Sequence, residues 1–185
     1  MVIHCASERQ ARMLRAKIVE RFRACGLELN HDKTRVVYCK DTNRKGSYEH
    51  AQFTFLGYTF RARKAKGARG EYFISFLPAM SPEALKAKGV RLRELRIHRR
   101  TDLTLFDLAR WLNPIVAGWM NFYGRFYHSA MEPLLLRINA YLRRWAGKKY
   151  QKLRTHKAFR TWWAGLTQRQ PRLFAHWQWA LGWRD

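Results

Sequence analysis

Basic side chains are the groups in this chain whose number and spacing best suit one kind of chemistry, the binding of phosphate. Lys and Arg number 37 and Asp and Glu number 13, which gives a formal charge of +24 at pH 7. Self-repulsion at this charge destabilises a compact chain unless a polyanion neutralises it. Nucleic acid is the expected polyanion, and an anionic membrane surface is the second choice.

Many of these cations stand in short runs, and we predict that they contact the phosphates of structured RNA. Such contacts position RNA by its shape rather than by its sequence, and an ordinary solvated protein face is the competing interpretation. The predicted RNA-binding residues are Arg63, Lys64, Lys66, Arg91, Arg93, Arg99, Arg100, Arg143, Arg144, Lys148 and Lys149.

The carboxylates are not arranged for metal-assisted phosphoryl transfer. That chemistry needs two carboxylates that bridge magnesium ions and hold the attacking and leaving oxygens in line. Asp32, Asp41, Asp102 and Asp107 are scattered among predicted turns and helix starts, where capping or turn formation is the simpler role. We therefore predict no catalytic residue and no metal site in this chain, and we do not expect it to polymerise nucleic acid alone.

The cysteines and the hydropathy of the chain indicate the cellular compartment in which it works. Cys5, Cys25 and Cys39 are odd in number and form no CxxC pair, so neither a disulfide framework nor a zinc cluster is indicated. No apolar run is long enough to cross a bilayer, and the N-terminus lacks the features of a secretory signal. A reduced, cytoplasmic location without membrane contact is expected.

The first part of the chain mixes one helix with several strands. Ser7 predicts a helix start, apolar residues follow at spacings of three and four, and Gly26 is typical of the helix end. Residues Arg63 to Gly70 are expected to form a basic connection between two strands. The predicted strands are Val2 to Cys5, Arg35 to Tyr38, Gln52 to Arg61 and Glu71 to Leu77.

The character of the sequence changes at Ser81-Pro82-Glu83, which is a strong helix start. From there the pattern is helical, and all eight tryptophans lie from Trp111 onward. We place the boundary near Ala79, between domains at 1–79 and 80–185. The predicted helices begin at Pro82, run from Leu105 to Phe126, open at Pro133, and occupy Lys157 to Leu166 and Leu173 to Leu181.

Two segments of the first domain resemble the sixth and seventh sequence blocks of group II intron reverse transcriptases. They are Gly26 to Tyr38 and Phe53 to Phe60, and Met1 to Cys5 looks like the strand that follows the Tyr-Ala-Asp-Asp motif of that family. The segment from Ser81 resembles the maturase-specific, or thumb, domain. Its most specific stretches are Leu112 to Tyr123, Tyr141 to Trp145 and Lys148 to Tyr150, and the whole resemblance runs from Met1 to about Trp183.

The resemblance implies an α+β fold: a partial palm, with strand–helix–strand and a β-hairpin, followed by an all-α maturase domain. It also implies substrate or primer contacts. Lys33 aligns with a lysine near the incoming triphosphate, and Leu56, Gly57 and Tyr58 resemble the hairpin that holds the primer end. From the residues alone, a solvated turn lysine and an ordinary hairpin with a bulge at Gly57 are the alternatives.

The resemblance further implies an RNA-binding piece of a bacterial group II intron reverse transcriptase. Such a piece would support the folding and splicing of group II intron RNA without the catalytic Asp-Asp motif. Mg²⁺ is expected only in the intact parent enzyme. A separate N-terminal reverse-transcriptase half and a DNA target are further candidate partners. Two alternatives stay open: the C-terminal part of a split or truncated RNA-directed DNA polymerase, and an inactive remnant whose Met1 is internal to a longer reading frame.

Two points about the second domain also stay open. Trp162, Trp163, Trp177 and Trp179 are so closely spaced that we do not expect all of them to face one interior, and one or two could stack on unpaired bases. The segment after Arg154 could belong to the thumb or begin a DNA-contacting domain.

Overall fold

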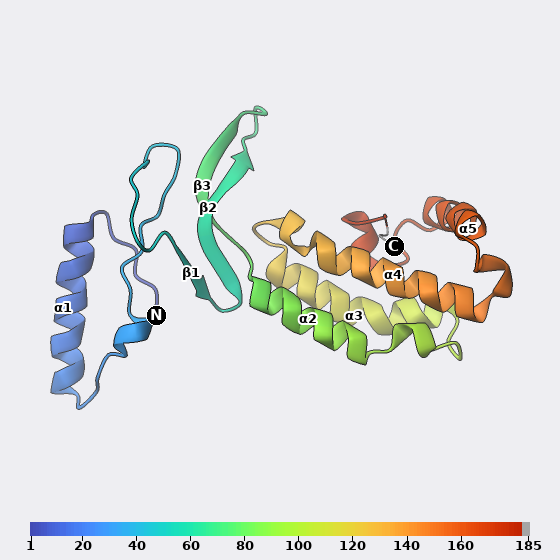
Figure 1. Ribbon diagram of the computed structural model, residues 1–185, viewed down its shortest axis with the longest axis horizontal. Helices are drawn as coiled ribbons and strands as arrows, with labels where there is room; N and C mark the ends of the chain where they lie inside the picture. The colour runs from blue at the N-terminus through green and yellow to red at the C-terminus, as the bar shows by residue number, and fades with distance from the viewer. Residues whose placement is uncertain (183–185) are drawn as a thin grey trace. The chain divides into compact units, whose positions relative to one another are not determined.

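The computed structural model describes residues 1–182, except for the side chain of His31, so Trp183 lies outside the described residues. The chain forms two compact units. Unit 1 comprises Met1–Phe53 and Arg61–Phe76, and unit 2 comprises Thr54–Phe60 and Leu77–Asp185. Each unit is considered by itself below, and Figure 1 identifies the elements.

One α-helix and a three-stranded antiparallel sheet precede the helical part of the chain. Helix α1 spans Glu8–Ala24, and the strands β1 (Gln52–Phe55), β2 (Tyr58–Lys66) and β3 (Tyr72–Met80) pair in that order. The predicted helix is confirmed: Ser7 accepts a hydrogen bond from the backbone N of Gln10, and Gly26 takes a left-handed φ of 69°.

Three predictions about strands are wrong. Val2 to Cys5 and Arg35 to Tyr38 form no strand, because no neighbouring strand supplies a ladder of backbone hydrogen bonds in the described residues. The segment predicted as a single strand from Gln52 is instead broken by a turn at Leu56-Gly57 into β1 and β2. The basic residues from Arg63 to Lys66 lie within β2 rather than in the connection after it.

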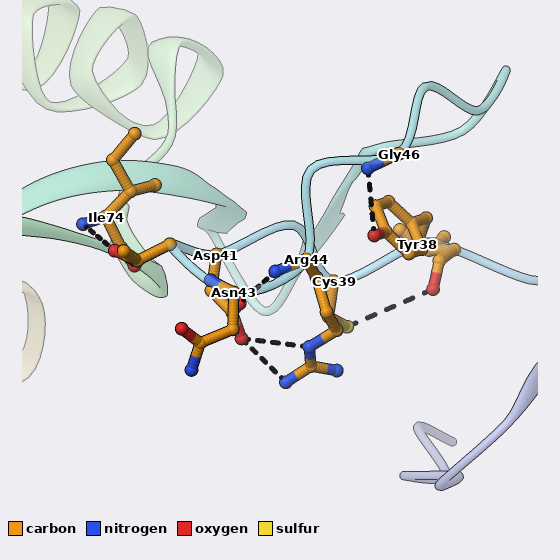
Figure 2. A network of polar contacts seen from close by, with 9 residues as sticks. Tyr38, Cys39, Asp41, Asn43, Arg44, Gly46 and Ile74 are labelled. Atoms are coloured by element: carbon orange, nitrogen blue, oxygen red, sulfur yellow. Dashed lines mark hydrogen bonds and ion pairs between the residues drawn. The ribbon is translucent and has the colours of Figure 1, made fainter.

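A polar network joins the loop after residue 38 to β3 within unit 1, as Figure 2 shows. Asp41 accepts hydrogen bonds from the backbone N of Asn43 at 2.9 Å and of Arg44 at 2.8 Å. The backbone N–H of Arg44 is the main cause that lowers the pKa of Asp41. Thr42 and Ile74 exchange backbone and hydroxyl hydrogen bonds of 2.8–3.1 Å. The turn-forming role predicted for Asp41 is confirmed.

Unit 2 is helical, as predicted. Its α-helices are α2 (Pro82–Glu94), α3 (Leu105–Tyr123), α4 (Glu132–Lys149) and α5 (His156–Arg169). Short 3₁₀ helices connect or follow them: η2 (Ile97–Arg99), η3 (His128–Met131), η4 (Gln151–Leu153) and η5 (Ala175–Gln178), while η1 (His31–Lys33) belongs to unit 1.

Local capping explains where two of these helices begin. The Ser81 side chain accepts from the backbone N of Ala84 at 3.0 Å, and Pro82 occupies the first helical position of α2. Thr104 and Asp107 form a reciprocal capping box at the start of α3. Asp107 therefore has the capping role expected from the sequence.

The C-terminal segment packs into the same core as helices α3 and α4. Phe174, Trp177 and Ala180 are buried with the residues of those helices, so the segment after Arg154 belongs to unit 2. The helix predicted from Leu173 to Leu181 is wrong, since only the short η5 forms there. Side chains rather than a helical ladder satisfy part of this backbone: Asn113 and Asn139 bond to Leu173, Ala175, Ala180 and Gly182.

The expectation that the four closely spaced tryptophans cannot all face one interior is also wrong. Trp163 and Trp177 are buried, with ring centroids 4.9 Å apart, and Trp162 and Trp179 are partly buried against the same core. One pair lies on α5 and the other on the short η5 and the residue after it, which lets both pairs turn toward one core. No helix within residues 1–182 is long and apolar enough to cross a membrane.

Candidate nucleic-acid interface

The connection between α2 and α3 is held against the C-terminal half of α4. Trp145 donates its indole N–H to the backbone O of Arg100 at 2.8 Å. Lys149 Nζ donates to the backbone O of Thr101 at 2.8 Å and of Leu103 at 2.7 Å. Ile97 is fully buried beneath this connection. These anchors fix the backbone that carries two of the predicted RNA-binding residues, Arg99 and Arg100.

Four cations on this connection and on α4 act on the charge of His98. Burial lowers the pKa of His98, and the charges of Lys148, Arg99, Arg144 and Arg96 lower it further, in that order. We call Arg96, Arg99, Arg144 and Lys148 the basic cluster. Within residues 1–182 none of the four forms an ion pair with a carboxylate.

Ring contacts hold the centre of the basic cluster. The His98 ring stacks on Tyr141 with centroids 5.6 Å apart and planes 23° apart. The Arg144 guanidinium lies 5.6 Å from the centroid of the same tyrosine ring. The Nδ1 atom of His98 is buried and has no hydrogen-bond partner in the described part of the chain.

Arg96 enters the basic cluster because the backbone bends sharply after α2. Its φ of 49° and ψ of 37° are left-handed, a conformation that costs a side-chain-bearing residue roughly 1–2 kcal/mol. A glycine usually takes this place after a helix. Strain of this kind is often retained where it positions a functional group. Sequence reasoning missed Arg96, because no local signal marks an arginine for a left-handed bend.

The side chains of the basic cluster are of the types that suit an anion with several oxygens. Arg offers a planar fork of donors that matches phosphate, and Lys148 adds a compact charge. Self-repulsion among the four cations falls when a polyanion approaches, so binding relieves an unfavourable arrangement. No group of three or more His, Cys, Asp or Glu side chains within the described residues is placed to hold a metal ion.

The other predicted RNA-binding residues of unit 2 differ in how far the protein itself engages them. Arg91 is exposed and 3.3 Å from Glu94, and Arg93 is exposed in the last turn of α2. Arg100 lies 5.3 Å from the Trp111 ring and 3.6 Å from Asp102. Arg143 is partly buried, and the ammonium of Lys149 is occupied by the two carbonyls described above.

The remaining basic residues of the prediction lie in unit 1. Arg63, Lys64 and Lys66 stand on β2, where Lys64 Nζ lies 4.2 Å and Lys66 Nζ 5.9 Å from the centroid of the Tyr72 ring. Lys33 is exposed at the end of η1, and its backbone N donates to the Asn30 side chain at 3.0 Å. Phosphate contacts by these four residues stay a prediction.

The predicted primer-binding turn belongs to unit 2. Leu56 and Gly57 have φ of 50° and 78°, as a two-residue hairpin turn requires. Leu56 is 70% exposed, whereas Tyr58 is buried and donates its hydroxyl to the backbone O of Phe122. A Cβ at Gly57 would lie 3.1 Å from the Tyr123 hydroxyl, so the turn needs a glycine for this close approach.

A comparison with protein families identifies the helical unit. Residues 85–163 match the family model for the group II intron, maturase-specific domain. The chain therefore contains a group II intron maturase-specific domain, which runs from α2 into α5 and carries the basic cluster, and this part of the predicted resemblance is confirmed. No curated protein and no solved structure matches the chain.

Proposed function

We propose that this chain is an RNA-binding, maturase-type protein that supports the folding and splicing of a group II intron RNA and does not copy RNA alone. The observation that carries the proposal is the basic cluster, because it lies within residues 85–163, the maturase-specific domain. The scattered carboxylates argue against polymerase chemistry, since Asp41 and Asp107 serve a turn and a helix cap. Primer extension by the purified chain would contradict this part of the proposal.

Charge alone makes any protein of +24 bind RNA at low salt, so the test must separate electrostatics from recognition. Binding of the whole chain is measured to a folded group II intron RNA and to an unrelated structured RNA of equal length, from 50 to 300 mM salt (roughly the range over which phosphate contacts weaken). A preference for the intron that persists at the highest salt supports the proposal. Equal binding that disappears together refutes it.

A double variant locates the contact. Arg99→Gln with Lys148→Gln removes two charges of the basic cluster, and Lys86→Gln with Arg169→Gln removes two exposed charges outside it. Each lost phosphate contact should flatten the slope of log affinity against log salt by about 0.7–0.9. We expect a change of about 1.4–1.8 for the cluster variant and a clearly smaller one for the control. Equal effects would show that this cluster is not the contact.

A second candidate function follows from the state of unit 1. No side chain of its described residues is buried, and Val2, Ile3 and Leu27 are 47–55% exposed. Helix α1 likewise has no buried residue, although it carries an apolar stripe. A partner protein that covered these apolar side chains would remove them from water, which favours association. A separately made N-terminal reverse-transcriptase half with the catalytic aspartates is the candidate partner.

Co-expression tests this second function. The chain and an N-terminal half that carries Tyr-Ala-Asp-Asp are produced together, and co-purification and primer extension are scored. Stable association with restored extension supports a split polymerase. Failure to associate, with a broad melt and rapid proteolysis before Ser81, would instead favour an inactive remnant, since unit 1 lacks a core of its own.

A further inference from the structure

We propose that one flank of α3, together with Phe126 just after its end, is a stacking site for unpaired RNA bases. This inference deepens the proposed RNA-binding function and rests on it. Four aromatic residues form this aromatic shelf: Trp111, Trp119, Phe122 and Phe126. At 100° per residue, the first three lie within about 80° of one another around the axis of α3. They flank the fully buried face of the helix and leave part of each ring outside the core.

Cations accompany three of the four rings. The pairs are Arg100 with Trp111 at 5.3 Å, Lys88 with Trp119 at 5.9 Å and Arg125 with Phe126 at 6.0 Å, from charged group to ring centroid. Between Leu108 and Met131 the sequence has no Asp or Glu. A base stacked on such a ring would bring its own phosphate toward the adjacent cation. Aromatic rings alternating with cations are the usual composition of single-strand binding surfaces.

The two phenylalanines, Phe122 in the last turn of α3 and Phe126 just after the helix, are the most accessible members of the shelf. Phe122 is 50% exposed and Phe126 is 54% exposed. Both contact the buried Tyr58, with centroids 5.4 Å and 5.8 Å from its ring. Tyr58 is itself fixed by its hydrogen bond to the backbone O of Phe122. The rings are therefore held before any ligand binds, and stacking on them costs little conformational entropy.

The cations beside the aromatic shelf favour RNA over a protein as the ligand of this surface. An apolar protein surface would bury Lys88, Arg100 and Arg125 with two of them lacking a carboxylate partner, which costs free energy. A single RNA strand supplies both flat bases and a phosphate for each cation. Of the four closely spaced tryptophans of the C-terminal half, Trp163 and Trp177 are buried and offer no ring face to a base. The ring of Trp179 is already stacked on His128 with centroids 4.2 Å apart.

The test compares single-stranded and double-stranded RNA binding by the whole chain. A 12-nucleotide oligouridylate is long enough to cover α3 between Trp111 and Phe122, about 16 Å at 1.5 Å per residue. Phe126→Ala and Phe122→Ala are each expected to weaken its binding by about 5- to 150-fold, the range for one stacked base. Phe126→Tyr should restore most of the loss. Binding to a 12-base-pair RNA duplex should change less than twofold, on the order of measurement error.

Phe106→Ala is the matched control. Phe106 is 56% exposed on the same helix and lies about 140–160° away from the shelf residues of α3 around the axis, so its loss should leave oligouridylate binding unchanged. A thermal melt of every variant separates unfolding from lost stacking. Equal oligouridylate affinity of the wild type and both shelf variants would overturn the inference.

The two proposals can fail separately. If the chain shows no preference for the intron but Phe126→Ala still weakens oligouridylate binding, the maturase function is rejected and the stacking site is kept. If intron preference depends on the basic cluster and the shelf variants have no effect, the maturase function is kept and the stacking site is rejected. A shelf variant that weakens duplex and single-strand binding equally would also count against stacking, because a paired base has no free face to offer.

Discussion

Asn139 joins α4 to the C-terminal segment of unit 2, and its replacement by alanine should destabilise the protein strongly. The side chain is fully buried. Its amide N donates to the backbone O of Ala180 at 2.9 Å and of Gly182 at 2.5 Å. Its amide O bonds to His176 Nε2 at 2.6 Å and accepts from the Trp177 indole N–H at 3.2 Å. Asn139→Ala removes all four hydrogen bonds at once.

The magnitude follows from those bonds. A buried hydrogen bond contributes about 1 kcal/mol net, so four bonds correspond to about 4 kcal/mol. A domain is stable by only about 5–15 kcal/mol, so this loss would place the variant close to unfolding. Asn113→Ala removes two partly buried bonds, to Leu173 and Ala175, and should cost about 2 kcal/mol.

Urea unfolding followed by tryptophan fluorescence measures the effect. Asn121→Ala is the control, because Asn121 is exposed on α3 and should change the free energy of unfolding by less than about 0.5 kcal/mol. The expected order of cost is Asn139, then Asn113, then Asn121. A cost below about 1 kcal/mol for Asn139→Ala would refute the view that this network holds the tail in the core.

Three further predictions concern pH, capping and strain. Burial lowers the pKa of His176 to about 3, and an unfolded histidine titrates near 6.5, so only the unfolded chain takes up this proton between those pH values. The free energy of unfolding should therefore fall by about 1.4 kcal/mol per pH unit below pH 6 from this residue, and His176→Gln should flatten the slope in urea titrations at pH 7 to 4.5. Ser81→Ala should lower the free energy of unfolding by about 1 kcal/mol, more than Ser7→Ala at the exposed cap of α1; equal costs would contradict this reading. Arg96→Gly should raise the melting midpoint by relieving about 1 kcal/mol of strain, and should weaken intron RNA binding; unchanged RNA binding would show that Arg96 makes no contact.

Several features of the helical unit were predictable because their causes are local. The Ser81 side chain accepts a hydrogen bond from a backbone N–H in the first turn of α2, and Pro82 fixes the backbone of that turn. Neither effect depends on what the helix packs against. Pro133 likewise fixes the backbone in the first turn of α4, although no side chain of the described residues caps that helix. The turn role of Asp41 and the capping role of Asp107 were also predictable, since a turn or a cap needs only backbone N–H groups within three residues.

The strands were less predictable, because a strand depends on a partner far along the chain. Arg35 to Tyr38 has the right composition, but only Tyr38 forms a backbone bond, to His50 at 2.8 Å. Gln52 to Arg61 reads as a single strand, yet Leu56 adopts a left-handed φ that turns it into a hairpin. The same limit applies to the tail, where side chains of α3 and α4 hold a segment that forms no long helix.

The amino-acid sequence by itself determined the charge of the chain, its helical half and the resemblance to a maturase domain, because these depend on composition and on spacing within single elements. Only the tertiary structure decided which charges can act together. The bend at Arg96 and the anchors on α4 place four cations where they act on His98. Lys149, in the same basic run of the sequence, instead donates its hydrogen bonds to backbone carbonyls. The tertiary structure also decided which aromatic residues are accessible to a ligand, because Trp177 is buried in the core and Phe126 lies at the surface.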